Sequence, residues 1–328
     1  MATSLPNVAI VAGLALLSGA ALAQSSAQPQ TYPVRPIRII VPNTAGSATD
    51  GVTRMVAQRL TEVWGQQMVV DNRAGASGII GHDTAAKAAP DGYTLLATTS
   101  AGLIIQPLLQ KVPYDPYRDF APISMIVLSP QMLVANPSVA ATNIEELVAL
   151  ARAKPGQLMC ASPGTGTSNH LGCEMVKAMT GVNILHVPYK GTAPAITDLV
   201  GGHVQLMFNS MPAVWPLAQA GKLRALAHGG TKRSPAAPNV PTVAETLPGF
   251  QCITWYAMVA PRATPAALVS RVNGEIVKML SDPAFAKRLV DQGQEPQSSS
   301  PAELTKYMRS ESERWAKVVK AAGLTTAH

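Results

Sequence analysis

The stretch that decides the fold is Ile37-Arg38-Ile39-Ile40-Val41, followed directly by Pro42-Asn43-Thr44-Ala45-Gly46-Ser47-Ala48-Thr49-Asp50. The β-branched apolar run at 37–41 predicts a buried strand. Apolar residues then recur at helical spacing across 52–63, and Gly65 is placed to end that helix. A strand that passes through a short turn into a helix is the unit of sheets covered by helices, so we expect an α/β fold.

The same unit recurs later in the chain. A strand at 158–161 leads through a Gly-rich turn into a helix at 168–180, which Gly181 is placed to end. A helix at 144–153 begins with the capping pair Asn143 and Glu146. Further strands are expected at 67–70, 93–97, 123–128, 132–135, 184–187, 204–208, 223–227 and 255–260, and further helices after 75–78, 264–265, 282–283 and 300–303. This alternation predicts parallel sheets flanked by helices.

The chain of 328 residues is long for one core, because single cores stop growing near ~250–300 residues. We expect two lobes, the first formed by 31–130 with 230–328 and the second by 131–229. Two strands would cross between them, which makes a hinge that permits closure.

The first 23 residues predict export. Val8 to Leu17 is an apolar run of signal-peptide length, and Ala21-Leu22-Ala23 supplies the small residues for cleavage near Ala23. No basic residue precedes the run, so an uncleaved anchor or a misassigned start is the alternative. The expected location is the periplasm.

The formal net charge is +7 and is spread along the chain without a Lys/Arg block, which argues against nucleic acid as a partner. The three cysteines include no C-x-x-C metal motif. Cys160 and Cys173 could form a disulfide in an oxidising compartment or remain buried thiols; the sequence leaves both open.

Two strand-to-helix turns have the chemistry of anion sites, because small residues let a ligand approach the amides of a helix N-terminus. A plain tight connection is the alternative for each. Beside them, Ser100 is a candidate hydroxyl donor and Tyr189 a candidate cleft wall together with Lys190. The alternative for Lys190 is that it only anchors the turn at Gly191. The turn residues proposed to bind the ligand are Asn43, Thr44, Ala45, Gly46 and Ser47 in the first turn, and Ser162, Gly164, Gly166, Thr167 and His170 in the second.

Catalytic motifs are not evident in the sequence. Neither a G-x-S-x-G nucleophile elbow nor an H-E-x-x-H metal motif occurs. An exported hydrolase that uses Ser162, Ser168 and His170 is the disfavoured alternative. We therefore predict that the protein is not an enzyme and has no catalytic residue, metal or cofactor.

Several longer motifs resemble one known family. They are Tyr32-Pro33-Val34-Arg35-Pro36-Ile37-Arg38, Asp71-Asn72-Arg73-Ala74-Gly75, Pro90-Asp91-Gly92-Tyr93-Thr94-Leu95-Leu96, and above all His186-Val187-Pro188-Tyr189-Lys190-Gly191-Thr192-Ala193-Pro194-Ala195. Across about Tyr32 to Trp315 the chain resembles the Bug (Bordetella uptake gene) family, the periplasmic solute receptors of tripartite tricarboxylate transporters.

The resemblance implies a type II periplasmic-binding-protein (Venus-flytrap) fold that binds a small carboxylate between its lobes and delivers it to the transporter's membrane subunits. The chain departs from the family at Ser47, where Gly is usual, and at Asn209, where Asp is often found facing the cleft. Asn209 joins the predicted ligand-binding residues, and an amide there favours a dicarboxylate or aromatic acid over an amino acid. A periplasmic sensor that presents the solute to a membrane histidine kinase is the alternative output. We expect a monomer.

Overall fold

The computed structural model describes Met1 and residues 32–324. Tyr32–His328 form one compact unit, separate from Met1–Thr31, and all elements named below belong to it. The predicted signal peptide at 1–23 lies, except for Met1, outside the described residues.

Across residues 32–324, ten strands carry the fold, and they belong to two sheets that share one long strand, β4. Their bounds are β1 Ile37–Val41, β2 Met68–Asn72, β3 Thr94–Thr99, β4 Phe120–Ala135, β5 Met159–Ser162, β6 Leu185–Pro188, β7 Leu206–Ser210, β8 Arg224–His228, β9 Ile253–Pro261 and β10 Glu295–Pro296.

The sheets are mixed rather than purely parallel. In the first sheet, β1 pairs in parallel with β2 and β3, while β9 runs antiparallel between β3 and β4. In the second sheet, β5 pairs in parallel with β6 and β7, while β4 runs antiparallel to β7 and β8. The predicted parallel pairs occur in both sheets, and the antiparallel members are the long strands β4 and β9 and the shorter strands β8 and β10.

Helices pack on both sheets. Their bounds are α1 Ala48–Trp64, α2 Ile79–Ala86, α3 Gln106–Leu109, α4 Ile144–Ala153, α5 Ser168–Thr180, α6 Thr192–Val200, α7 Met211–Gln219, α8 Ala266–Ser281, α9 Pro283–Val290 and α10 Pro301–Ala321, with short 3₁₀ turns at Ala76–Gly78 and Val243–Glu245 and a π-helical turn at Ala101–Ile105.

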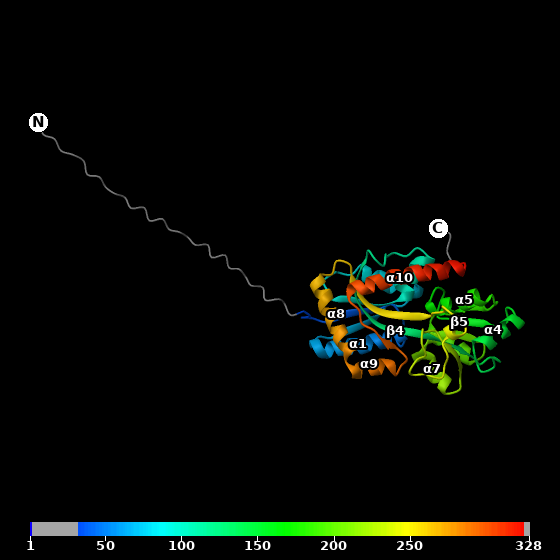
Figure 1. Ribbon diagram of the computed structural model, residues 1–328. Helices are drawn as coiled ribbons and strands as arrows, with labels where there is room; N and C mark the ends of the chain where they lie inside the picture. Colours follow the sequence, from blue (N-terminus) through cyan, green and yellow to red (C-terminus); the bar gives the residue numbers. More distant parts are fainter. Residues whose placement is uncertain (2–31, 325–328) are drawn as a thin grey trace. The chain divides into compact units, whose positions relative to one another are not determined.

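Strand β4 joins the two halves of the fold. Its first part, to Pro130, pairs with β9, and its last part, from Gln131, pairs with β7 and β8. Figure 1 shows β4 running from the region of α1, α8 and α9 toward that of α4, α5 and α7. We call the part built on the first sheet lobe one and the part built on the second sheet lobe two; the predicted boundary residues stay predictions.

The sequence predicted two separate extended segments at 123–128 and 132–135, and this was wrong: Pro130 does not interrupt β4. Pro130 has no backbone N–H to donate to the sheet, yet it lies opposite Ile253 in the pairing of β4 with β9. The helices α6 and α7 were not predicted. Within residues 32–324, no helix is long and apolar enough to cross a membrane.

Candidate functional site

The first turn, residues 42–50, connects β1 to α1. Ser47 is the N-cap of α1 and accepts a hydrogen bond from the Asp50 amide at 3.3 Å. The Gly46 amide, at a left-handed φ of 79°, donates to Asp50 Oδ2 at 2.9 Å. Arg54 and Asn72 also donate to the Asp50 carboxylate, at 2.9 and 3.0 Å. The aspartate thus holds the turn in shape.

Asp50 remains a carboxylate although it is buried. Burial raises its pKa, but the hydrogen bonds from Arg54, Gly46 and Asn72 outweigh it, and the pKa lies below its usual range. The amides of Ala48 and Thr49, at the first two positions of α1, have no hydrogen-bond partner in the described chain. They are the donors that this turn can offer a ligand.

The second turn, residues 162–170, repeats this geometry between β5 and α5. Thr167 is the N-cap and accepts from the His170 amide at 3.3 Å. The Gly166 amide, at φ 74°, donates to His170 Nδ1 at 3.1 Å. The amides of Ser168 and Asn169 have no partner within the described residues, so they match those of Ala48 and Thr49.

A buried cluster supports the second turn from behind. The rings of His170 and His186 stack with centroids 3.7 Å apart, and His186 Nε2 lies 2.7 Å from the Ser162 hydroxyl. Burial first and the neighbouring His170 second lower the pKa of His186 to about 4, so the ring is neutral at pH 7. A disulfide between Cys160 and Cys173 joins β5 to α5 across the turn. This settles the alternative that the sequence left open.

The first cavity, of about 360 Å³, lies between the two turns. None of the described residues that line it carries a charge, and hydroxyl and amide side chains predominate. The lining is Asn43, Thr44, Ala45, Gly46, Ser47, Ala48, Thr49, Thr99, Ala101, Gln131, Pro163, Thr167, Ser168, Asn169, Thr192, Ala193, Ile196, Asn209, Ser210, Ala213, Thr254 and Tyr256.

The second cavity, of about 590 Å³, shares part of its lining with the first. The shared wall includes Asn43, Thr44, Thr99 and Thr167. Its own walls are the segment 74–78 of lobe one and the segment 189–191 of lobe two. Both volumes fall within the ~300–1,000 Å³ typical of small-molecule sites.

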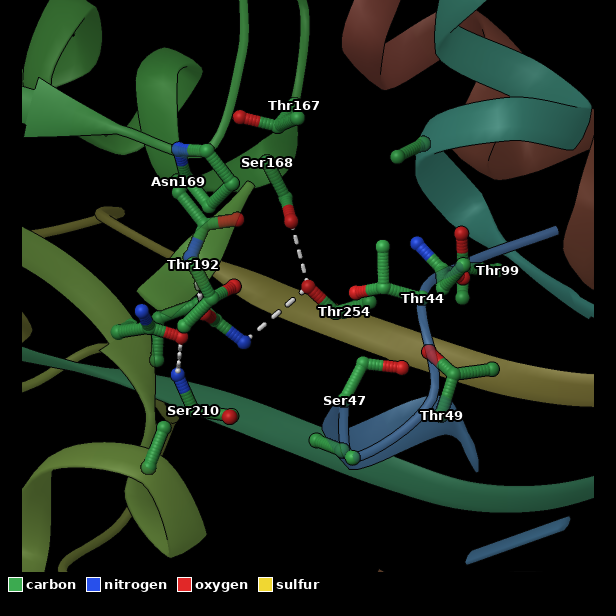
Figure 2. Close-up of a pocket in the computed structure, with 18 of the residues that line it drawn as sticks. Thr44, Ser47, Thr49, Thr99, Thr167, Ser168, Asn169, Thr192, Ser210 and Thr254 are labelled. Atoms are coloured by element: carbon green, nitrogen blue, oxygen red, sulfur yellow. Dashed lines mark hydrogen bonds between the residues drawn. The ribbon is translucent and has the colours of Figure 1, made fainter. Parts of the chain in front are cut away.

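Neutral side chains form hydrogen bonds between the lobes at the base of the first cavity. The hydroxyls of Ser168 on α5 and Thr254 on β9 are hydrogen-bonded, as Figure 2 shows. Gln131 on β4 donates to Thr254 Oγ1 at 3.1 Å and accepts from Asn169 Nδ2 at 2.9 Å. This network fixes the start of α5 against the strands that connect the lobes.

The lobes also touch at the tip of the second turn. Ser77 Oγ and Gln106 Nε2, both of lobe one, donate to the Thr165 carbonyl at 3.3 and 3.4 Å. A Cβ atom added at Gly166 would lie 2.1 Å from Leu109 Cδ1. The structure is therefore that of a closed arrangement with direct contact between the lobes.

The structure brings nine of the sequence-predicted ligand-binding residues to the cavity walls. The first cavity is lined by Asn43, Thr44, Ala45, Gly46, Ser47, Thr167 and Asn209, and the second also by Gly164 and Tyr189. Asn209 is 4% exposed, and its Oδ1 accepts from the Ser210 amide at 2.8 Å. Lys190 lines the second cavity beside Tyr189.

Four predicted residues line neither cavity: Ser100, Ser162, Gly166 and His170. Ser162 and His170 are committed to the cluster behind the turn, and Gly166 faces α3. Ser100 is fully buried at the start of the π-helical turn. Its neighbours on either side, Thr99 and Ala101, line both cavities instead.

Sequence reasoning missed Gln131, Thr254, Tyr256, Asn169 and Ser210. Thr254 and Tyr256 alternate along β9, and this period of two is a signal that two neighbouring side chains share a face. Nothing local marked Gln131 and Ser210, because their place in the site depends on the pairing of β4 with β7.

This architecture matches a known family. Residues 52–324 match the sequence profile of the tripartite tricarboxylate transporter family receptors, TctC. The chain belongs to this family. Its two-lobed α/β fold is the type II fold of periplasmic binding proteins, and the resemblance to the Bug proteins is confirmed.

Relatives of known structure or name are similar over nearly their full length. BugT of Bordetella pertussis is 39% identical, with 89% of this chain and 91% of that one covered. R. palustris Rpa4515, solved with adipate, is 37% identical at a TM-score of 0.86, with 89% of this chain and 98% of that chain covered. MatC from Rhodopseudomonas palustris, solved with malate, is 30% identical at a TM-score of 0.81, with 88% and 100% covered.

The family and these relatives are solute-binding proteins and not enzymes. The protein is accordingly a solute-binding receptor.

Proposed function

We propose that the protein is a periplasmic receptor that captures a small carboxylate between its two lobes and delivers it to membrane subunits of the tripartite tricarboxylate type. One observation carries the proposal: the first cavity is lined by two helix N-termini, one from each lobe, and no described residue in its lining is charged.

A carboxylate fits this cavity because its four lone-pair positions can accept from several neutral donors at once. The amides of Ala48, Thr49, Ser168 and Asn169 supply such donors. Each charge-assisted hydrogen bond contributes ~1.5–3 kcal/mol, and each helix N-terminus adds ~0.3–1 kcal/mol. Three or four such bonds, less the cost of immobilising the ligand, reach the ~8 kcal/mol of a micromolar complex.

Binding would favour the closed form because the donors belong to both lobes. A ligand shifts a conformational equilibrium only by its difference in affinity for the two states. A carboxylate that accepts from α1 and α5 together makes its full set of bonds only when the lobes are closed. The lobes we propose are 31–130 with 230–328, and 131–229.

The solutes favoured are dicarboxylates or aromatic acids rather than amino acids. A ligand ammonium needs a carboxylate partner, and Asn209 supplies an amide where it lines the first cavity. The relatives solved with adipate and malate support this class.

The experiment is a thermal-shift screen of dicarboxylates, hydroxy acids, aromatic acids and amino acids. We expect a dicarboxylate or aromatic acid to raise the melting temperature. A shift with sugars or cations alone, and none with any carboxylate, would contradict the proposal.

Delivery and location need separate tests. Deleting the gene should abolish uptake of the solute that the screen identifies, while growth on an unrelated carbon source is unchanged. The protein recovered from the periplasm should begin at Gln24 and behave as a monomer, and a signal-bearing protein that stays in the cytoplasm would contradict the location.

A further inference from the structure

The second cavity extends the first one outward and differs from it in charge. Lys190 is the one charged side chain among the described residues that line it, and the lining contains neither Asp nor Glu. Lys190 is exposed and has no ion-pair or hydrogen-bond partner in residues 32–324. Its ammonium group is therefore available to a ligand.

The other titratable side chains in the second cavity are neutral. Burial lowers the pKa of His82 to about 4, and this ring is held between the Gly78 carbonyl and the Thr98 hydroxyl, both at 2.7 Å. Burial first and Asp198 second raise the pKa of Tyr189 to about 12, and its hydroxyl donates to Asp198 at 2.7 Å. Lys190 is accordingly the one side chain among the described lining residues that carries a charge at pH 7.

Segment 75–78, the opposite wall, has an unusual backbone. Four successive residues have positive φ: Gly75 at 132°, Ala76 at 47°, Ser77 at 54° and Gly78 at 95°. For Ala76 and Ser77, which carry a Cβ atom, the left-handed conformation is strained. Strain of this kind persists where surrounding contacts over-determine it, and it is concentrated at ligand clamps and active sites.

Surrounding contacts hold this wall in place. The His82 ring bonds to the Gly78 carbonyl, and a Cβ atom at Gly102 would lie 2.2 Å from that ring. Ser77 reaches across the cleft to the Thr165 carbonyl. A rigid, strained wall in lobe one thus faces the unpaired lysine of lobe two across the cavity.

The two cavities share lining residues, so a single ligand can extend through both. Asn43 and Thr192 line both, and Asn43 Oδ1 is buried without a hydrogen-bond partner in the described chain. An extended ligand with one end at the helix N-termini would pass this junction and place its other end in the second cavity.

We propose that the second cavity is a distal subsite for the second carboxylate of an extended aliphatic dicarboxylate, with Lys190 as its cationic contact. This inference rests on the proposed function, because the first carboxylate is held in the first cavity. It selects extended dicarboxylates over aromatic monocarboxylic acids, which carry no second anionic end, and over short diacids, which stay within the first cavity.

The test is calorimetric titration of the full mature protein with four probes: adipate, hexanoate, malonate and benzoate. Adipate and hexanoate differ only in the second carboxylate. We expect adipate to bind most tightly, and Lys190→Gln to weaken adipate roughly fivefold, the upper range for an exposed ion pair. The same variant should leave hexanoate unchanged, and Lys190→Arg should restore adipate binding.

Lys222→Gln is the matched control, because it removes the same charge from an exposed position of lobe two that lines neither cavity. It should leave the preference for adipate intact, and 0.5 M salt should reduce that preference in the wild type through screening. Equal binding of adipate and hexanoate, tighter binding of benzoate or malonate, or an unchanged preference in Lys190→Gln would overturn the distal subsite alone. Failure of all four acids would also overturn the distal subsite, whereas the proposed function itself falls only if no carboxylate in the thermal-shift screen binds.

Discussion

The first and second turns have nearly the same backbone conformation, but different interactions stabilise them. Gly46 and Gly166 have φ values of 79° and 74°, and the N-caps that follow have φ and ψ of −69° and 161° at Ser47 and −75° and 156° at Thr167. In each turn the glycine amide donates to the side chain four residues later. That acceptor is the carboxylate of Asp50 in the first turn and the imidazole of His170 in the second.

The difference shows that one local conformation can be stabilised by charge or by packing. Asp50 is buried in lobe one and is held by hydrogen bonds from Arg54 and Asn72. His170 is 2% exposed, stacks on His186 and lies behind a turn that carries a disulfide and contacts the other lobe. Reduction of the disulfide, a larger side chain at the turn glycine, or mild acid should therefore destabilise the second turn far more than the first.

Removal of the disulfide should have the largest effect. The bridge closes a loop of sequence separation 13, and loops of this size contribute about 3 kcal/mol to stability. We expect Cys160→Ala/Cys173→Ala to lower the free energy of unfolding by about this amount in denaturant titrations. Hydrogen exchange should quicken in the second turn and stay unchanged in the first.

The control is dithiothreitol, which should destabilise the wild type and leave the double variant unaffected. Equal faster exchange in both turns would show that the bridge does not act locally.

Substitution of the two glycines separates strain from contact between the lobes. Gly46→Ala and Gly166→Ala both place alanine at a left-handed φ, which costs about 1–2 kcal/mol of stability in each. Only at Gly166 would the Cβ atom meet the other lobe, 2.1 Å from Leu109 Cδ1 and 2.7 Å from Gln106 Nε2. At Gly46 it meets no atom within 4 Å.

We therefore expect Gly166→Ala to weaken ligand binding at least about tenfold more than Gly46→Ala, since overpacking typically costs 1–3 kcal/mol. Calorimetric titration measures the affinity, and small-angle scattering measures closure with ligand present. Similar affinity losses in the two variants would contradict the contact between lobes at this turn.

As the pH falls, the second turn should lose stability before the first turn does. The pKa of His186 is about 4 in the folded protein and about 6.5 in the unfolded chain, so its contribution is complete above pH 6.5 and is lost as the pH falls toward 4. Asp50 has a lowered pKa, so its contribution is complete above the unfolded value near 3.9 and is lost only at lower pH. The titratable groups near His186 are His170, Glu174 and Lys177.

His186→Gln should reduce the fall in melting temperature between pH 7 and pH 5, and Asp50→Asn should reduce only the fall below about pH 4. The comparison is made against the wild type, because His82 and His228 also have pKa values near 4 and titrate in the same range. An identical pH profile for His186→Gln and the wild type would contradict the assignment.

Substitution of the helix N-cap residues should have the smallest effect on stability. Replacing Ser47 or Thr167 by Ala costs about 1 kcal/mol of stability in each helix. Thr167 also donates to the Gly164 carbonyl at 2.8 Å, so Thr167→Ala should cost more than Ser47→Ala in thermal unfolding. The reverse order would show that the hydroxyl bond within the second turn contributes nothing.

The sequence predicted both turns and their helices, because N-caps, positive-φ glycines and apolar periodicity are local signals. α4 and α5 begin and end at the predicted residues, and α1 ends at Trp64, directly before the predicted stop at Gly65, but begins four residues before the predicted apolar pattern. It did not predict which side of each turn faces the cavity. Ser162 and His170 have the chemistry of ligand contacts, yet the pairing of β5 with β6 places His186 beside them and commits them to the cluster.

The most direct test of carboxylate capture between two helix N-termini is an amide nuclear magnetic resonance titration of the mature protein with adipate. The account predicts that the amide protons of Ala48 and Thr49 in lobe one and of Ser168 and Asn169 in lobe two shift downfield together at one common saturation point. Saturable adipate binding that leaves the amides of either lobe unmoved would contradict it.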